Sequence, residues 1–168
     1  MAVYTTITQT EAQQLFKPLG EIKKFEGIRE GVENTNYLVH LNDSKKYILT
    51  IFEKRTNEKD LPYFNKLMKL FHSNGVSCPL SVTIKNEDLF RINEKPCCIY
   101  SFVEGRPLLE INKEKLNSLG SSIAHLHKSG INSKLFRKNM MLLPSWKNIT
   151  ESFSRNSTNI HIDEYNYI

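Results

Sequence analysis

Small polar residues around a glycine give one segment of this sequence the chemistry to bind phosphate. The segment contains Gly31, Glu33, Asn34, Thr35 and Asn36. A glycine lets backbone N–H groups approach phosphate oxygens closely, and asparagine and threonine side chains add hydrogen-bond donors. Because asparagine and glycine are also ordinary residues of β-hairpin turns, the segment by itself favours a turn over a ligand site.

A second segment suits a ligand by its position rather than its composition. Ser101, Phe102 and Val103 end an apolar run and lead into Glu104 and Gly105. Where such a segment links two lobes, its backbone N–H and C=O groups can bind the edge of an adenine ring, and apolar neighbours can cover the ring. The alternative is a strand that simply ends in a turn.

Short-range patterns predict the elements that place the first segment. Thr8 and Glu11 have the spacing of a capping box, which predicts a helix that ends before Gly20. Apolar residues between turn residues predict three antiparallel strands at 22–28, 35–41 and 46–52. The glycine-containing segment therefore lies between the first two strands.

The apolar period then changes to that of a helix. The helical stripe consists of Phe64, Leu67, Met68 and Phe71. Asp60 is the expected N-cap, and Gly75 is the expected stop. Short strands are expected after this helix at 80–85, 89–93 and 97–103.

A second helical stripe follows the connector at 104–107. It consists of Leu116, Leu119, Ile123 and Leu126, with Gly130 near its end. We therefore predict an α+β fold in two parts. Residues 1–103 form a lobe with an antiparallel sheet, and residues 104–168 form the connector and the beginning of a helical lobe, which is incomplete.

Composition excludes several classes of protein. The 168 residues are 39% hydrophobic, enough for one domain or for a small lobe and the start of another. No apolar run approaches a membrane span and the N-terminus lacks a signal-peptide pattern, so we expect a cytoplasmic protein without membrane contact. The net charge of +5 is spread along the chain without a recognisable module, which argues against nucleic-acid binding.

The cysteines also fit a reducing compartment. Cys97 and Cys98 are adjacent in a predicted strand and so face opposite sides, while Cys78 stands alone. We expect three free thiols and no metal site built from them.

Several motifs together carry a resemblance to a known family. They are GVENTNYLV from Gly31, KYILTIFEKR from Lys46, GVSCP from Gly75, SFVEG from Ser101, and the pairs Leu119-Gly120 and Leu126-His127. In this order they resemble kinases of the aminoglycoside-phosphotransferase and choline-kinase fold. With the opening AVYT and the run DLPYF from Asp60, the chain is most similar to the homoserine kinase branch, from Ala2 to about Phe153.

This resemblance implies a bilobal, protein-kinase-like fold that transfers the γ-phosphoryl group of ATP, with Mg²⁺, to the hydroxyl of L-homoserine, a step of threonine synthesis. It implies that ATP contacts the glycine-containing segment, Ser101 to Val103, and Thr50 in the third strand. Other acceptors of the same superfamily (choline, ethanolamine, an aminoglycoside) and a non-catalytic nucleotide-binding or interaction module remain alternatives.

Thr50 marks a departure from the wider superfamily. Many relatives have a lysine there that holds phosphates and pairs with a glutamate on the following helix. Here Phe64 or Asn65 falls near the glutamate position, so that ion pair is not assignable. Lys46 and Lys54 are nearby cations without an assigned role.

The catalytic aspartates are the larger departure. Phosphoryl transfer needs an aspartate beside the attacking hydroxyl and another to hold Mg²⁺. His161-Ile162-Asp163 resembles the family's catalytic loop, but it comes too early and lacks an asparagine at the right offset. We therefore expect the catalytic and metal-binding residues to lie beyond Ile168, and we expect no phosphotransfer by this chain alone. We also expect self-association through the apolar stripe of the helix that contains Leu116 and Leu126, which should be left exposed.

Overall fold

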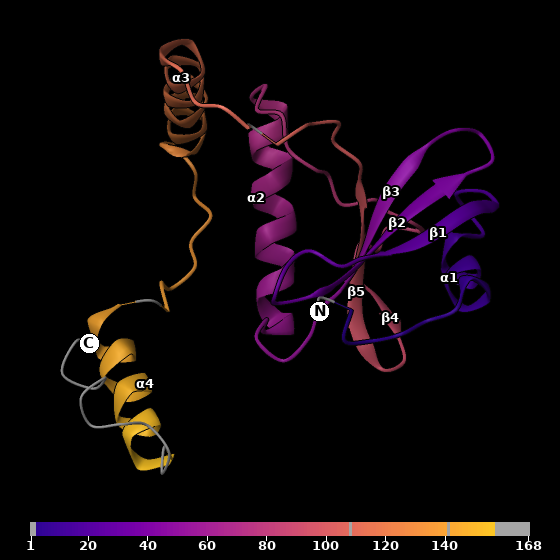
Figure 1. The fold of residues 1–168 in the computed structure, drawn as a ribbon, viewed down its shortest axis with the longest axis horizontal. Coiled ribbons are helices and arrows are strands. Elements are labelled where there is room, and N and C mark those ends of the chain that lie inside the picture. The colour runs from indigo at the N-terminus through magenta and orange to yellow at the C-terminus, as the bar shows by residue number, and fades with distance from the viewer. Residues whose placement is uncertain (1–2, 108, 141, 157–168) are drawn as a thin grey trace. The chain divides into compact units, whose positions relative to one another are not determined.

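The computed structural model describes residues 3–107, 109–140 and 142–156 (Figure 1). The chain divides between Leu135 and Phe136 into two compact units. The first unit contains the sheet and three α-helices, and the second contains α4 (Leu143–Asn156). The lobe boundary expected after residue 103 stays a prediction.

An antiparallel five-stranded sheet forms the centre of the first unit. Its strands are β1 (Ile22–Ile28), β2 (Thr35–Leu41), β3 (Lys46–Ile51), β4 (Phe90–Ile92) and β5 (Lys95–Ser101), in the spatial order β1-β2-β3-β5-β4. The helices are α1 (Gln9–Phe16), α2 (Leu61–Ser73), preceded by the 3₁₀ turn η1 (Glu58–Asp60), and α3 (Lys113–Gly130). The predicted helices and the three consecutive strands are confirmed, with β3 ending one residue early.

The expectation of a strand at 80–85 is wrong. Residues there reach β5 through two backbone hydrogen bonds, from Ser101 N to the Leu80 carbonyl and from Val82 N to the Ile99 carbonyl, both 2.8 Å long. Lys85 and Asn86 then have φ angles of 51° and 69°. This left-handed turn reverses the chain before a longer ladder can form.

The last two strands also differ from their expected bounds. Asn93 and Glu94 have positive φ angles, as in the two-residue turns that suit the twist of a hairpin. Because that turn fixes the register, β5 begins at Lys95 and ends at Ser101 instead of covering 97–103.

The two-residue period of the strands divides the sheet into two faces. Tyr37, Leu49 and Ile99 are register neighbours on one face and are buried against α1, where Phe16 is fully buried. We call this side the α1 face. Figure 1 shows α1 and α2 on opposite sides of the sheet.

The opposite side is the α2 face. Leu38, Ile48 and Tyr100 form one register row across it. The helix α2 packs on the part near β5, where Leu61 and Cys98 are fully buried.

A polar cluster of Thr5, Thr35, Glu53 and Lys95, here the Glu53 cluster, ties the N-terminal residues to the sheet. The Glu53 carboxylate accepts hydrogen bonds from the hydroxyls of Thr5 at 2.6 Å and Thr35 at 2.8 Å, and an ion pair with Lys95 completes its contacts. Burial raises the pKa of Glu53, but its contacts with Lys95, Thr5 and Thr35 outweigh burial and lower the pKa below the ordinary value.

This pKa shift predicts an acid-sensitive contribution to stability. Because the pKa of Glu53 is lower in the folded state, its contribution is complete above the unfolded pKa and is lost as pH falls through the folded pKa. Between about pH 6 and about pH 3, we expect wild type to lose more free energy of unfolding than Glu53→Gln. Urea denaturation at both pH values measures the difference.

Glu33→Gln is the matched control, because the Glu33 side chain makes no hydrogen bond within the described residues. It should follow the wild-type pH dependence. Equal losses in wild type and Glu53→Gln would contradict the stabilising role of the charged carboxylate.

Candidate functional site

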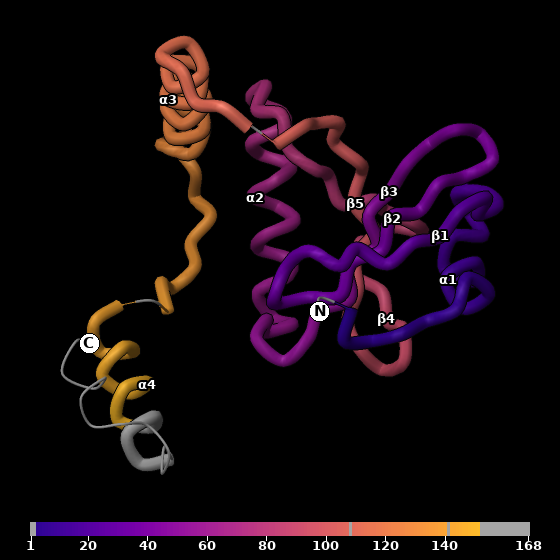
Figure 2. The backbone as a smooth tube through the Cα atoms, viewed as in Figure 1, coloured from indigo at the N-terminus to yellow at the C-terminus, as the bar shows by residue number. Residues whose placement is uncertain are grey.

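The candidate residues form two groups at opposite ends of the sheet. Loop 29–34 joins β1 to β2 at the end where Thr35 pairs with Ile51, and Ser101 pairs with Tyr47 at the other end. Along β3 these two pairs are four positions apart, or about 13 Å at 3.3 Å per residue. Figure 2 shows the loop near the N-terminal residues, away from the connector that leaves β5.

Loop 29–34 presents backbone donors. Gly31 has a φ angle of +106°, a backbone conformation that residues with a side chain rarely adopt. Within the described residues, the N–H groups of Gly31, Val32 and Glu33 have no hydrogen-bond partner. The Asn34 side-chain oxygen accepts a hydrogen bond from Glu53 N at 3.3 Å. The loop is therefore held at its end while its earlier N–H groups stay available to an anion.

Thr35 and Asn36 have opposite orientations because they are consecutive residues of β2. The Thr35 hydroxyl is fully buried in the Glu53 cluster, so it does not reach a ligand on the α2 face. Asn36 lies on the α2 face, where its side-chain oxygen accepts a 2.8 Å hydrogen bond from the Thr50 hydroxyl. The predicted contact residues Asn36 and Thr50 thus lie side by side, with the amide nitrogen of Asn36 left as a donor.

Two apolar residues that the sequence analysis did not single out lie on the same face. Leu38 and Ile48 are register partners, and both are half-buried. Together they provide an apolar surface for a flat ring between Asn36 and the connector. The alternation in the two strand patterns was the available signal, since it predicts that these residues share a face.

The connector end combines an aromatic ring with free backbone groups. The Lys46 ammonium lies 5.1 Å from the centroid of the Phe102 ring and 2.6 Å from the Glu104 carboxylate. The backbone N–H and C=O of Val103 have no hydrogen-bond partner within the described residues. Ser101 is engaged elsewhere, because its hydroxyl accepts a 2.9 Å hydrogen bond from Leu80 N.

An uncharged contact joins α2 to the sheet near the usual lysine and glutamate positions. Asn65, on α2, is buried, and its side-chain oxygen accepts a 3.0 Å hydrogen bond from the Tyr100 hydroxyl. Its amide nitrogen donates to the Cys98 sulfur at 3.7 Å. Burial raises the pKa of Tyr100 and of Cys98, so both stay neutral at physiological pH.

A pocket of about 400 Å³ opens beside loop 29–34. It is lined by Tyr4, Val32, Glu33, Glu53, Lys54, Arg55 and Lys95. Lys95 is paired with Glu53, whereas Lys54 and Arg55 make no ion pair within the described residues. Of the two lysines without a role, Lys54 therefore lies beside the loop and Lys46 lies at the connector end.

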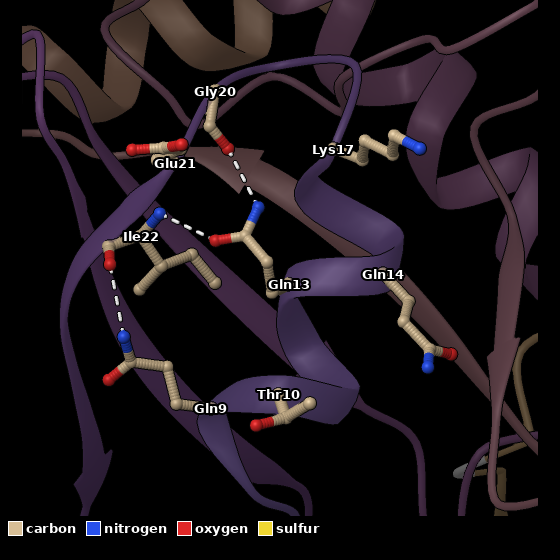
Figure 3. A pocket seen from close by; sticks show the side chains of 8 residues that line it. All are labelled: Gln9, Thr10, Gln13, Gln14, Lys17, Gly20, Glu21 and Ile22. Atoms are coloured by element: carbon tan, nitrogen blue, oxygen red, sulfur yellow. Dashed lines mark hydrogen bonds between the residues drawn. The ribbon is translucent and has the colours of Figure 1, made fainter.

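A larger groove of about 740 Å³ between α1 and the start of β1 contains none of the predicted site residues (Figure 3). Its glutamines bind the backbone at the beginning of an edge strand. Gln13 accepts from Ile22 N at 2.7 Å and donates to the Gly20 carbonyl at 3.0 Å, while Gln9 donates to the Ile22 carbonyl. These side chains complete the sheet edge, which gives the groove a structural explanation.

Within the part of the chain that the structure describes, no group of three histidine, cysteine or acidic side chains is arranged to hold a metal ion. Over the same residues, no helix is long and apolar enough to cross a membrane. Cys78, Cys97 and Cys98 are free, and burial raises the pKa of Cys97 to about 12. His161 to Asp163 lie outside the described residues.

Comparisons with known proteins place these observations in a family. Residues 24–150 match the model of the phosphotransferase enzyme family (APH). The chain is 37% identical over 155 residues to a homoserine kinase of Parvibaculum lavamentivorans, covering 90% of the chain and 48% of the relative. It is 37% identical over 150 residues to a homoserine kinase of Brucella anthropi, covering 88% and 46%. The chain thus spans about half the length of the curated relatives it matches.

Solved structures support the same fold. A spectinomycin phosphotransferase, in complex with ADP and spectinomycin, has a TM-score of 0.68 at 15% identity, over 94% of this chain and 50% of that one. An amicoumacin kinase, in complex with AMP-PNP and Ca²⁺, has a TM-score of 0.65 at 14% identity, over 91% and 56%. The predicted kinase-like α+β fold is confirmed, and the chain belongs to the phosphotransferase enzyme family.

Proposed function

We propose that this chain provides the ATP-binding part of a kinase that converts L-homoserine to O-phospho-L-homoserine. The observation that carries the proposal is the 37% identity to homoserine kinases over about 90% of the chain. The fold supports it independently, because an apolar surface on the α2 face lies between a donor-rich loop and a connector with free backbone groups.

In this proposal the nucleotide lies along the strands on the α2 face. The adenine rests on Leu38 and Ile48, and the free backbone groups of Val103 bind its edge. The phosphates lie about 13 Å farther along, near the N–H groups of loop 29–34 and the amide of Asn36. Catalysis by this class of enzyme rests on positioning and charge stabilisation, which such an arrangement supplies for ATP.

Lys54 is the proposed cation at the phosphate end. It lines the pocket beside the loop and has no ion-pair partner within the described residues. Lys46 is less suited because Glu104 already neutralises it at the other end of the sheet. The uncharged contact between Asn65 and Tyr100 then replaces the usual lysine–glutamate pair in joining α2 to the sheet.

Mg²⁺ is expected to accompany ATP, but the described residues do not fit a metal site. We therefore assign no residue of this chain to the metal or to the transfer of the acceptor proton. The catalytic aspartates are proposed to come from the part of the family's fold that these 168 residues do not cover.

We also propose that the protein works in the cytoplasm. Its three free cysteines are compatible with a reducing compartment, and ATP and an amino-acid acceptor are available there.

A phosphotransfer assay tests the proposed function. Purified protein is incubated with [γ-³²P]ATP, Mg²⁺ and L-homoserine, and O-phosphohomoserine is separated and counted. The assay compares the 168 residues with a chain extended through the downstream reading frame. We expect product from the extended chain and none from the 168 residues, which lack a described metal site.

Choline, ethanolamine and an aminoglycoside serve as competing acceptors in the same assay. If one of them is phosphorylated in preference to homoserine, that acceptor is the substrate and the proposal of homoserine is wrong. ATP binding without transfer to any acceptor by either chain would favour a non-catalytic nucleotide-binding module.

Gly31→Ala tests the role of the loop. The φ angle of +106° strains any residue with a Cβ atom by about 1–2 kcal/mol, so the loop should leave its present conformation. We expect affinity for ATP to fall about tenfold, measured by isothermal titration calorimetry.

Gly120→Ala is the matched control, because Gly120 lies in α3 and an added Cβ would meet nothing within 4 Å. It should bind ATP as wild type does. An unchanged affinity in Gly31→Ala would remove the loop from the nucleotide site.

Self-association is a further part of the proposal. Leu116, Leu119 and Ile123 of α3 are 54%, 50% and 45% exposed, which leaves an apolar stripe in contact with water. We expect the mean mass of the 168 residues to rise with concentration in sedimentation velocity, and the rise to shrink in Leu119→Gln. A monomer throughout a hundredfold range of concentration would contradict this expectation.

A further inference from the structure

We propose that the N-terminal residues Tyr4 and Thr5, together with the Glu53 cluster, form a clamp that holds loop 29–34 in the conformation that receives phosphates. This inference rests on the proposed binding of ATP to the loop. It makes Tyr4, Thr35 and Glu53 positioning residues, since they form hydrogen bonds with the loop and with one another.

The clamp contacts the loop at several points. The Tyr4 hydroxyl donates a 3.0 Å hydrogen bond to the Val32 carbonyl within the loop. At the end of the loop, the Thr35 hydroxyl oxygen accepts hydrogen bonds from Tyr4 N at 2.9 Å and Thr5 N at 3.0 Å. Glu53 N binds the side-chain oxygen of Asn34, the last residue before β2. The loop is thus fixed from outside the sheet while its free N–H groups remain available.

The hydrogen-bonding capacity of the Thr35 hydroxyl is fully used. A hydroxyl has one donor and two acceptor sites, and Thr35 uses all three, donating to Glu53 and accepting from two backbone N–H groups. The Thr5 hydroxyl donates to Glu53 and accepts from Lys95 at 2.7 Å. Removing one hydroxyl would therefore leave several polar groups without partners in a site where Thr35 is fully buried.

A close approach of the chain supports the clamp independently. A Cβ atom added to Gly27, near the end of β1, would lie 3.0 Å from the Val3 side chain. Val3 therefore packs directly over the strand that leads into the loop, and the glycine provides the space. The N-terminal segment is in contact with both strands that flank the loop, since Tyr37 of β2 also binds Ile7 N and the Thr5 carbonyl.

Loss of the clamp should affect ATP and adenosine differently. A loosened loop should weaken contacts with phosphates and leave the adenine surface at Leu38, Ile48 and Val103 unchanged. Affinity for ATP should therefore fall while affinity for adenosine stays constant. General destabilisation of the sheet would instead weaken both ligands together.

The test compares Thr35→Val with Thr35→Ser in the 168-residue chain. Valine keeps the shape of threonine without its hydroxyl, and serine keeps the hydroxyl. Titration calorimetry measures ATP and adenosine binding, and hydrogen exchange with mass spectrometry measures protection of the amides in loop 29–34. We expect Thr35→Val to lose about tenfold in ATP affinity with little change for adenosine. Thr35→Ser should rescue most of the ATP affinity.

Tyr4→Phe provides a second variant in case Thr35→Val fails to fold. Tyr4 is 55% exposed, so loss of its hydroxyl removes the bond to Val32 without opening the core. We expect the affinity for ATP to fall several-fold while the affinity for adenosine stays constant. Amide hydrogen exchange in loop 29–34 should become faster.

The outcomes separate this inference from the proposed function. If wild type binds ATP and both Tyr4→Phe and Thr35→Val match it, the clamp is wrong and ATP binding stands. If ATP and adenosine affinities fall equally, the residues act only on stability and the clamp is again wrong. If wild type binds neither ligand, the proposed function fails. The clamp is then judged by hydrogen exchange alone, and unchanged amide exchange of loop 29–34 in the variants would show that it is wrong.

Discussion

The alternation of side chains along β2 decides which residues are buried in the core and which can meet a ligand. Thr35, Tyr37 and Val39 are buried on the α1 face, and the residues between them lie on the α2 face. A shift of register by one residue would exchange the two sets and bury Asn36 where Tyr37 now packs. Because that exchange would expose apolar side chains to water, it is unfavourable. The proposed contact residues therefore stay on the α2 face, and the buried residues stay on the α1 face.

Local patterns were sufficient for the elements of the first half of the sheet. The capping box at Thr8 and the alternation in β2 depend on neighbours within a few residues, and both are present in the structure. The strand expected at 80–85 failed because its ladder is ended by the left-handed turn at Lys85 and Asn86, whose residue types do not require that conformation. Where a turn ends a strand, the pattern of apolar residues gives little information on the position of that end.

The candidate site was predictable in part. The sequence identified the loop and the connector, but it could not predict that the Thr35 hydroxyl is turned away from the α2 face toward Glu53. Nor could it predict that Lys46 is paired with Glu104 while Lys54 lines the pocket beside the loop. Such roles are set by partners far apart in sequence, to which periodicity is insensitive.

The Glu53 cluster also has a consequence for the order of folding. Thr5 and Lys95, which are hydrogen-bonded there, are separated by 90 positions in the chain. Contacts of such long sequence separation form late, since the entropy of closing a large loop must be overcome first. On the ribosome, the hairpin of β1 and β2 can form as soon as its residues emerge, but the cluster is complete only after Lys95 has been synthesised. In a nascent chain, β1 and β2 can therefore pair well before loop 29–34 takes its final conformation.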